Sequence, residues 1–279
     1  MGLQDYQPPV SQLLTFGDDG DIYLENYYIE QFGFTEEHIP DLIRMVIDRE
    51  LNGADSDTLE VWAPIHAWRS LGQLRAAAAV KPLLSLIDEL KDSDCYTDEL
   101  PTVLAQIGPV AIPDLIAYLG NPHYNSDQRT MIAESLAVIG IEYPDFRDQC
   151  VEILTQRLAD YANNPNELNG WLVCYLMDLK AVESASVIEA GFAADAINPF
   201  IAGDWYDVQV ELGLKTWEEL PERENIVHKH LTEAIHEYSK IHPKSPNYGG
   251  FVTRSNKNKT KTKAKAKANP KKKKKKKRK

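Results

Sequence analysis

The pentapeptide IPDLI occurs twice in this chain, at Ile39–Ile43 within EEHIPDLIRMVI and at Ile112–Ile116 within GPVAIPDLIAYL. In both copies the proline is near a predicted helix start, where its missing N–H removes no helical hydrogen bond, and the Leu-Ile pair is placed to face a core. A third segment, VKPLLSLIDEL, has Pro82 in the same setting. The three prolines, Pro40, Pro82 and Pro113, are separated by 42 and 31 residues, which is typical of helix-pair repeats.

A second periodic feature supports the repeat. Aliphatic-Gly pairs are predicted to close three helices, at Gly72, Gly108 and Gly140, because glycine adopts the left-handed conformation that ends a helix. Each glycine is followed by another apolar segment of helical period, which predicts an alternation of outer helix, turn and inner helix. A fourth unit has Lys180 where glycine is expected, so the repeats are divergent.

The predicted fold class is all-α. Period-two alternation is scarce, and Ala, Leu and Glu outnumber clusters of Val, Ile and Thr in the expected elements. Each helix pair leaves an apolar face that only a neighbouring pair covers, so the pairs should stack into a solenoid. We expect an N-terminal helical cap at 1–34, HEAT-like helix pairs at 35–195, capping helices at 196–240 and a disordered Lys-rich tail at 241–279.

The charge is divided sharply along the 279 residues. Sixteen of the 31 Lys and Arg residues lie in Arg254–Lys279, which has no Asp or Glu and no large apolar residue. The preceding residues therefore carry 15 basic and 42 acidic side chains, a net formal charge of −27. The tail buries too little apolar surface to fold alone, so disorder is expected. Its polybasic end consists of Lys271, Lys272, Lys273, Lys274, Lys275, Lys276, Lys277, Arg278 and Lys279.

The composition favours a cytoplasmic protein. The sequence has no run of eighteen apolar residues, which predicts no membrane span, and its start lacks the features of a signal peptide. Cys95, Cys150 and Cys174 are odd in number and far apart, which favours reduced thiols over disulfides. Cys150 and Cys174 fall within apolar helical patterns, where a buried thiol is usual. The oligomeric state is left open.

The Leu/Ile-Gly turns and Pro-bearing apolar helices resemble HEAT and HEAT-like repeats over roughly Thr35–Ala194. The chain from VSQLLTFGD through HIPDLIRMVI to NPFIAGDWYDVQVELGL further resembles the uncharacterised bacterial family called domain of unknown function 1186. This resemblance implies no known activity. It implies a Cys-rich zinc-binding motif near the C-terminus of some members, but this chain has its Lys-rich tail there. We therefore expect no zinc and no other cofactor.

The segment INPFIAGDWYDVQVELG contains the candidate binding residues Asp204, Trp205, Tyr206 and Asp207. Exposed aromatic side chains often anchor protein partners, so an acidic-aromatic recognition patch is one interpretation. The favoured interpretation is structural. Asp204 is placed to cap a helix, and Asp207 lies in its first turn, where a negative charge is favourable.

The same helix has a predicted apolar stripe. Trp205, Val208 and Leu212 share one helical face, so Trp205 should be packed inward, and the residue after it, about 100° around the helix, should be more exposed. Gly213 is expected to stop the helix, and Leu214 to pack back onto it.

The segment TWEELPERENIVHKHLTEAIHEY raises a metal hypothesis. Thr216 and Glu219 have capping-box spacing, and the apolar period predicts a following helix at about 221–239. Within it, Glu233 and His236 have the Glu-x-x-His spacing of di-iron bundles. A second such motif and an HExxH are both missing, so a solvated polar face is favoured and no metal site is predicted.

No enzyme motif is present. The sequence lacks GxSxG, GxxxxGK[ST] and GxGxxG, which gives no support for a hydrolase elbow or a phosphate-binding loop. The acidic turn GDDGDIYLE around residues 18–21 lacks the frame and closing glutamate of a calcium loop, so a solvated helix connection is expected. We predict no catalytic residue.

Three classes of function follow. The preferred class is a protein-interaction scaffold that binds another protein through its solenoid surface and attracts acidic partners through its tail. The first alternative is a nucleic-acid-associated protein whose tail binds phosphates, although the acidic body repels polyanions and no aromatic residue lies among the tail lysines. The second is an enzyme such as a HEAT-like lyase that attaches bilin pigments, which rests on repeat type alone. The tail could also fold back on the acidic body.

Overall fold

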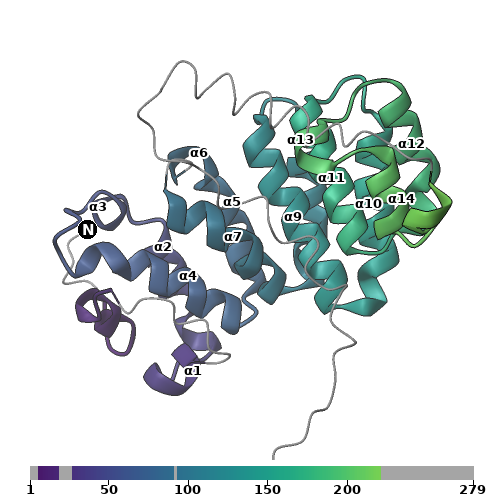
Figure 1. The fold of residues 1–279 in the computed structure, drawn as a ribbon. Helices are drawn as coiled ribbons and strands as arrows, with labels where there is room; N and C mark the ends of the chain where they lie inside the picture. The colour runs from purple at the N-terminus through teal and green to yellow at the C-terminus, as the bar shows by residue number, and fades with distance from the viewer. Residues whose placement is uncertain (1–5, 19–26, 91–92, 221–279) are drawn as a thin grey trace, which may run out of the picture. The chain divides into compact units, whose positions relative to one another are not determined.

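The computed structural model describes residues 6–18, 27–90 and 93–220, all within the unit Met1–Val227. These residues form helices and no strand, so the all-α prediction is confirmed for them (Figure 1). The α-helices are α1 (Tyr27–Phe32), α2 (Ile39–Val46), α3 (Arg49–Asn52), α4 (Ala63–Gln73), α5 (Val80–Ser85), α6 (Ile87–Leu90), α7 (Asp94–Ile107), α8 (Ile112–Leu119), α9 (Ser126–Glu142), α10 (Arg147–Ala159), α11 (Asn166–Asp178), α12 (Ala185–Ala193), α13 (Pro199–Ala202) and α14 (Trp205–Glu211).

Short 3-10 helices, labelled η, occur along the described residues, and several lead directly into an α-helix. They are η2 (Val10–Thr15), η3 (Glu36–His38), η4 (Glu60–Trp62), η5 (Ala77–Ala79), η6 (Pro109–Ala111), η7 (Pro144–Phe146), η8 (Val182–Ser184) and η9 (Trp217–Glu219). Five of them lead directly into α2, α5, α8, α10 and α12, which we call the second helices. The helices that precede them, α1, α4, α7, α9 and α11, are the first helices. The alternation of two helices and a turn is therefore present in the element order.

Both IPDLI copies start a second helix, α2 and α8, as predicted. The proline lies in the first turn of each, and Leu42 and Leu115 are fully buried. The expectation that Ile116 also faces the core is wrong, because its side chain is exposed. Adjacent helix positions point about 100° apart, so when Leu115 faces the core the side chain of Ile116 lies at the edge of the buried face.

Of the three predicted glycine stops, one is confirmed. Gly108 ends α7 with φ of 95°. Lys180 has φ of 52° directly after α11, so it takes the positive-φ conformation expected of glycine there. The residue with this conformation after α4 is Arg75, with φ of 51°, and Gly72 lies inside the helix.

Gly72 and Gly140 are instead positions of close packing, and the predicted helix ends there are wrong. A Cβ on Gly140 would lie 2.8 Å from Leu179 Cδ2 and 3.1 Å from Cys150 Cβ. A side chain at this position would force Leu179 or Cys150 to shift, so glycine allows these two residues to approach α9 closely. The helix continues to Glu142.

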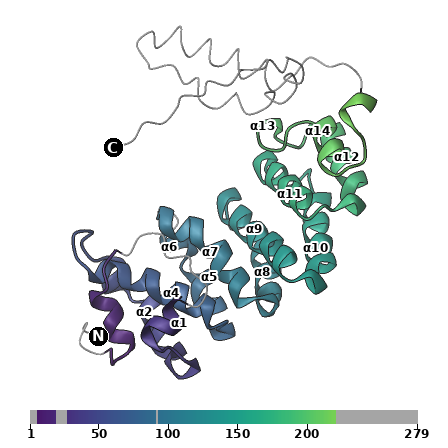
Figure 2. The same cartoon turned by 60° about the horizontal axis from the view of Figure 1, so that its bottom comes forward.

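The first helices pack one against the next. α1 packs on α4, α4 on α7, α7 on α9, α9 on α11 and α11 on α13 (Figures 1 and 2). The second helices α2, α5, α8 and α10 each contact the first helix of the following pair. One hydrophobic cluster, which includes residues from Tyr6 to Leu212, runs through these interfaces. Each pair thus buries its apolar surface against its neighbours.

The predicted C-terminal features lie partly outside the described residues. The tail at 241–279, its polybasic end Lys271–Lys279 and the helix expected at 221–239, with Glu233 and His236, are among residues that the structure does not describe. The acidic turn around residues 18–21 is described only at Asp18. These predictions stay predictions.

Candidate functional site

The segment around Trp205 forms a capped helix. Asp204 Oδ1 accepts hydrogen bonds from the backbone N–H groups of Tyr206 at 2.8 Å and Asp207 at 3.1 Å. Asp207 Oδ2 accepts one from the backbone N–H of Asp204 at 2.9 Å, which completes a capping box. The predicted cap is confirmed, and both carboxylates act on their own backbone. A binding role for Asp204, Trp205, Tyr206 and Asp207 stays a prediction.

The apolar stripe of α14 is also present. Val208 and Leu212 are buried, and Trp205 packs against the same core, with its ring centroid 6.3 Å from that of Phe192. Trp205 and Tyr206 are both only partly buried. The prediction that Tyr206 is the more exposed of the two therefore stays a prediction.

The end of α14 differs in one respect from the prediction. Gly213, with φ of 71°, follows the last turn as expected. Leu214 does not pack back onto the helix, because its side chain is exposed. Its backbone N–H donates to the carbonyl of Gln209 at 2.8 Å, so the hydrogen bond alone closes the helix end. The predicted capping box at Thr216 and Glu219 is present.

A different surface gathers carboxylates from successive first helices. Asp98 lies on α7, Glu134 on α9 and Asp178 on α11. Among the described residues none of the three has an ion-pair partner. We call these three residues together with Trp171 and Tyr175 the acidic-aromatic face.

Electrostatics shows that the carboxylates are close enough to affect one another. Burial raises the pKa of Glu134, and the charges of Asp98 and Asp178 raise it further, against a lowering by the hydrogen bond from Tyr175. Burial also raises the pKa of Asp178, which Lys180 lowers and Glu211 raises. A partly buried carboxylate surrounded by like charges is unfavourable to ionise, so a cation placed here would be stabilising.

Two aromatic residues of α11 belong to this face, and one of them, Tyr175, contacts Glu134. The rings of Trp171 and Tyr175 are stacked, with centroids 6.0 Å apart, and Trp171 remains 42% exposed. Tyr175 Oη donates to Glu134 Oε2 at 3.4 Å. Burial raises the pKa of Tyr175, so the hydroxyl stays protonated and keeps its donor role. The surface therefore combines an exposed π-face with an oriented carboxylate.

A small cavity of about 60 Å³ lies next to this face, between α4 and α7. Asp98 and Thr102 of α7 line it, and so does the ion pair of Arg69 and Glu99. Arg69 Nη2 lies 2.5 Å from Glu99 Oε1 and its Nε 2.7 Å from Glu99 Oε2. Their side chains are only 13% and 8% exposed, so this is a buried, bidentate pair.

The same ion pair continues into a buried polar network toward the N-terminus. Arg69 Nη1 lies 3.3 Å from Tyr28 Oη, which lies 2.8 Å from His66 Nδ1. His66 Nε2 lies 2.8 Å from the carbonyl oxygen of Gly17 and must donate, because a carbonyl only accepts. His66 Nδ1 then accepts from Tyr28. The network joins α1 and the preceding segment to α4.

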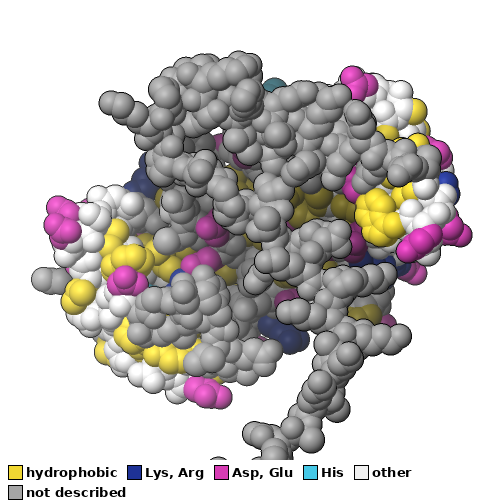
Figure 3. Space-filling view, viewed as in Figure 1, with side chains coloured by type: hydrophobic (Ala, Val, Ile, Leu, Met, Phe, Trp, Pro, Cys, Tyr) yellow, Lys and Arg dark blue, Asp and Glu magenta, His cyan; other side chains and the backbone are white. Residues whose placement is uncertain are grey.

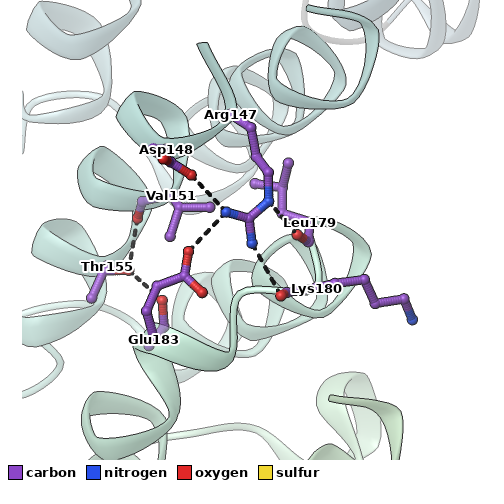
Figure 4. A network of polar contacts seen from close by, with 8 residues as sticks. Arg147, Asp148, Val151, Thr155, Leu179, Lys180 and Glu183 are labelled. Atoms are coloured by element: carbon purple, nitrogen blue, oxygen red, sulfur yellow. Dashed lines mark hydrogen bonds and ion pairs between the residues drawn. The ribbon is translucent and has the colours of Figure 1, made fainter. Parts of the chain in front are cut away.

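Arg147 forms a second network at the start of α10 (Figure 4). Its Nε and Nη2 each donate at 3.0 Å to the carbonyls of Leu179 and Lys180 at the end of α11. Its Nη1 lies 2.8 Å from carboxylate oxygens of Asp148 and Glu183. These contacts satisfy carbonyls that a helix end leaves without intrahelical partners, so the network is structural.

A groove of about 500 Å³ borders this network between α10 and η8. The hydroxyls of Thr155 and Ser184 within it are 2.7 Å apart, and Thr155 also donates to the carbonyl of Val151 at 2.7 Å. Because the two hydroxyl groups hydrogen-bond to each other and to the backbone, neither is aimed into the groove to orient a ligand. The groove is a weaker candidate than the acidic-aromatic face.

The thiols are poor candidates for catalysis. Burial raises the pKa of Cys150 and of Cys174 to about 11, so both are protonated at neutral pH. Cys150 is buried, as predicted, whereas Cys174 is only partly buried, and the side chain of Cys95 lies outside what the structure describes.

The described residues contain no group of three or more His, Cys, Asp or Glu arranged to hold a metal ion. In this part of the chain, no single helix has the length and apolar character to cross a membrane. One pair of helical segments, Tyr96–Ile107 and Pro109–Leu119, has that length and composition when taken together, but the two are bent by 105° at their junction.

Comparison with protein-family models, with curated proteins and with solved structures finds no match to this chain. The acidic-aromatic face is therefore the candidate site on geometry alone. The sequence reasoning missed this face because its carboxylates occupy unrelated positions of their helices. Asp98 is near the start of α7, Glu134 is in the middle of α9, and Asp178 is the last residue of α11.

Proposed function

We propose that this protein is an interaction scaffold whose acidic-aromatic face binds a Lys- or Arg-rich segment of another protein. In this proposal the helix pairs form a HEAT-like solenoid, which is the architecture that presents such extended surfaces. The observation that carries it is the row of Asp98, Glu134 and Asp178, none of which forms an ion pair with another described residue. The charges of Asp98 and Asp178 add to burial in raising the pKa of Glu134.

The spacing of the helices suits an extended peptide. Packed helices lie about 8 to 10 Å apart, and an extended chain advances about 3.3 Å per residue. Basic side chains about three residues apart would therefore reach carboxylates on neighbouring first helices. A peptide that crosses α7, α9 and α11 would neutralise like charges that otherwise repel one another.

Trp171 supports the same class of ligand. Its exposed ring lies beside Tyr175, which is hydrogen-bonded to Glu134. A cation over an indole face gains about 0.5 to 2 kcal/mol, depending on how far it is desolvated. An exposed aromatic ring and a carboxylate that both contact Tyr175 favour a side chain with a long apolar stem and a positive end.

The charge of the chain favours a basic partner and disfavours nucleic acid on this surface. The residues before the tail carry a net formal charge of −27. Acidic side chains also appear at more places than basic ones on the view in Figure 3. Such a field attracts basic segments and repels phosphates. Two further proposals are based on the sequence alone. One is that the tail attracts acidic partners, and the other is that the chain belongs to the family called domain of unknown function 1186.

The experiment is calorimetric titration of the full chain with a Lys-rich peptide. A synthetic copy of residues 257–267, KNKTKTKAKAK, serves as the probe, and the same peptide with Gln for Lys is the uncharged control. We expect Glu134→Gln to weaken binding of the charged peptide about fivefold, the size of a well-placed, partly exposed ion pair.

The matched control variant is Glu189→Gln, an exposed residue of α12 that also removes one negative charge. It should change binding by less than about twofold, because distant exposed charges are screened by salt. Equal weakening by both variants would mean that the peptide responds to net charge and not to this face. Absence of binding by the unmodified chain would overturn the proposed function.

A further inference from the structure

Arg129 on α9 is the one buried arginine among the described residues, at 5% exposure, and it forms no ion pair with any of them. Its Nε donates to the carbonyl of Leu119 at 2.9 Å and its Nη2 to Asn164 Oδ1 at 3.2 Å. Both acceptors are neutral. A guanidinium stays protonated, and a buried charge is costly unless an opposite charge lies close to it. The described part of the chain therefore supplies hydrogen bonds to Arg129 but no counter-ion in direct contact.

Two other arginines with limited exposure are neutralised. Arg69 is paired with Glu99. Arg147 donates to carbonyls at the end of α11 and also pairs with Glu183. Arg129 donates in the same way to the carbonyl at the end of α8, without a carboxylate beside it in the described residues. Closing a helix end explains its hydrogen bonds and leaves its charge unexplained.

A second guanidinium, that of Arg157 in the last turn of α10, is close to Arg129. Asn164, which accepts from Arg129, also donates to the backbone carbonyl of Arg157 at 2.9 Å. Arg157 forms an ion pair with Asp160. Burial and the charge of Arg157 lower the pKa of Arg129, whereas the charge of Asp160 raises it. We call Arg129, Arg157 and Asp160 the arginine cluster, and its two cations and one carboxylate have a net charge of +1.

Three donors in and beside the arginine cluster lack an acceptor among the described residues. Arg157 Nε and Ser126 Oγ are both buried without a hydrogen-bond partner there. Arg129 Nη1 makes no hydrogen bond to a described residue either. Ser126 precedes Arg129 by three residues on α9, so the two side chains lie on the same face of the helix. A buried donor without an acceptor is unfavourable, so the region lacks acceptor atoms as well as negative charge.

The start of α9 adds positive character to this region. Ser126 is the first residue of α9, a helix of 17 residues that packs on both α8 and α10 (Figure 2). The N-terminus of a helix has about half a positive charge and favours anions. Guanidinium groups bind phosphate and carboxylate oxygens through parallel N–H donors. A small oxyanion would supply both what the region lacks, a negative charge and several acceptor oxygens.

We propose that Arg129, Arg157 and the start of α9 bind a small oxyanion of the phosphate class. The anion accepts hydrogen bonds from the guanidinium groups and from Ser126, and it balances the net charge of the arginine cluster. The side chains of Arg157 and Asp160 are 17% and 45% exposed, so the anion enters from their side. Asp160 repels it and limits its affinity. This site is separate from the acidic-aromatic face and does not depend on the proposed function.

The test uses inorganic phosphate as the probe and thermal melting of the full chain, followed by circular dichroism, as the readout. The melting temperature in about 20 mM phosphate is compared with that in chloride of equal pH and ionic strength. We expect a rise of about 3 to 6 °C that saturates as phosphate is increased, because the ligand binds the folded state alone. Phosphate also stabilises proteins by exclusion from their surface, an effect that needs no site and does not saturate. Equal melting temperatures in phosphate and chloride would overturn the proposal.

Three variants separate the site from general effects of phosphate, and the melting curve of each in chloride shows that it is folded. Arg157→Gln should abolish most of the rise, whereas Arg49→Gln, at an exposed arginine of α3, should keep it. Asp160→Asn removes the repelling carboxylate and should lower the phosphate concentration at half-saturation about fivefold. An equal rise in Arg157→Gln and in the unmodified chain would show exclusion and no site. Unchanged or weaker phosphate binding by Asp160→Asn would also contradict the proposed position of the anion.

Discussion

Tyr175 on α11 donates a hydrogen bond to Glu134 on α9, with its Oη 3.4 Å from Oε2 of the carboxylate. The two residues are 41 positions apart in the sequence, and the ring of Tyr175 also stacks with the exposed ring of Trp171. The hydrogen bond lowers the pKa of Glu134, but burial and two neighbouring carboxylates raise it more. The folded chain therefore maintains a charge that is unfavourable for its own stability.

The first prediction is that Glu134→Gln stabilises the free protein at pH 7. Glutamine keeps the shape and an acceptor for Tyr175 but removes the repulsion from Asp98 and Asp178. We expect the melting temperature to rise by about 1 to 3 °C, since partly exposed charges contribute roughly 0.5 to 1 kcal/mol. Circular dichroism melting measures this, with Glu189→Gln as control. A fall in melting temperature would mean that Glu134 has a stabilising structural role.

The second prediction concerns the pH dependence of that stability. Because its pKa is raised, Glu134 holds its proton more tightly in the folded than in the unfolded chain. The resulting stabilisation is complete below the ordinary value of 4.5 and is lost as the pH rises through the raised pKa. The free energies of unfolding of the unmodified chain and of Glu134→Gln should therefore converge as the pH is lowered. A difference that is constant between pH 7 and pH 4 contradicts this linkage.

The third prediction is that binding of a Lys-rich peptide weakens on acidification. Protonation removes the charge of Glu134 and Asp178, and their raised pKa values place this change above the range of an ordinary carboxyl group. The loss should begin above about pH 4.5 and should be smaller for Glu134→Gln. Calorimetry at a series of pH values should also detect proton uptake when the peptide dissociates. Affinity independent of pH would indicate contacts elsewhere.

The fourth prediction tests the buried pair of Arg69 and Glu99. Glu99→Ala leaves a guanidinium without its carboxylate inside the protein, so we expect a loss of about 3 kcal/mol in the free energy of unfolding. Replacing both partners, by Arg69→Met with Glu99→Leu, should recover most of it because no unpaired charge remains. Urea denaturation measures both. If the double variant is no more stable than Glu99→Ala, the Arg69–Glu99 pair stabilises the fold by more than cancelling two buried charges.

The fifth prediction concerns α14. Asp204→Ala removes the acceptor of two backbone N–H groups and should cost about 1 kcal/mol. Trp205→Ala should cost less than the roughly 3 to 5 kcal/mol of a fully buried aromatic residue, because Trp205 is only partly buried. Denaturation curves of both variants check the values. A Trp205→Ala curve that overlays the unmodified chain would restore Trp205 as a leading candidate for partner binding.

Features that depend on residues close together in the sequence were predictable. The all-helical class, the start of α2 and α8 at IPDLI and the caps at Asp204 and Thr216 depend on contacts within a few residues. The turn at Lys180 was located by its place in the repeat, and its φ of 52° agrees. These features follow local rules of propensity, capping and helical period.

Features that depend on neighbouring helices were not predictable. Gly140 has the same local pattern as a helix stop, yet it lies inside α9, where Leu179 and Cys150 approach it closely. The exposure of Ile116 and Leu214 was misjudged for the same kind of reason, since each depends on what packs beside it.

The sequence by itself determined that the chain is helical, where several helices begin, and that an acidic body precedes a Lys-rich tail. Only the tertiary structure placed Asp98, Glu134 and Asp178 on one face and the cavity beside Asp98. The physical reason is that the lateral register of two helices is fixed by many side chains packing across their interface. That register has no signature within either helix alone.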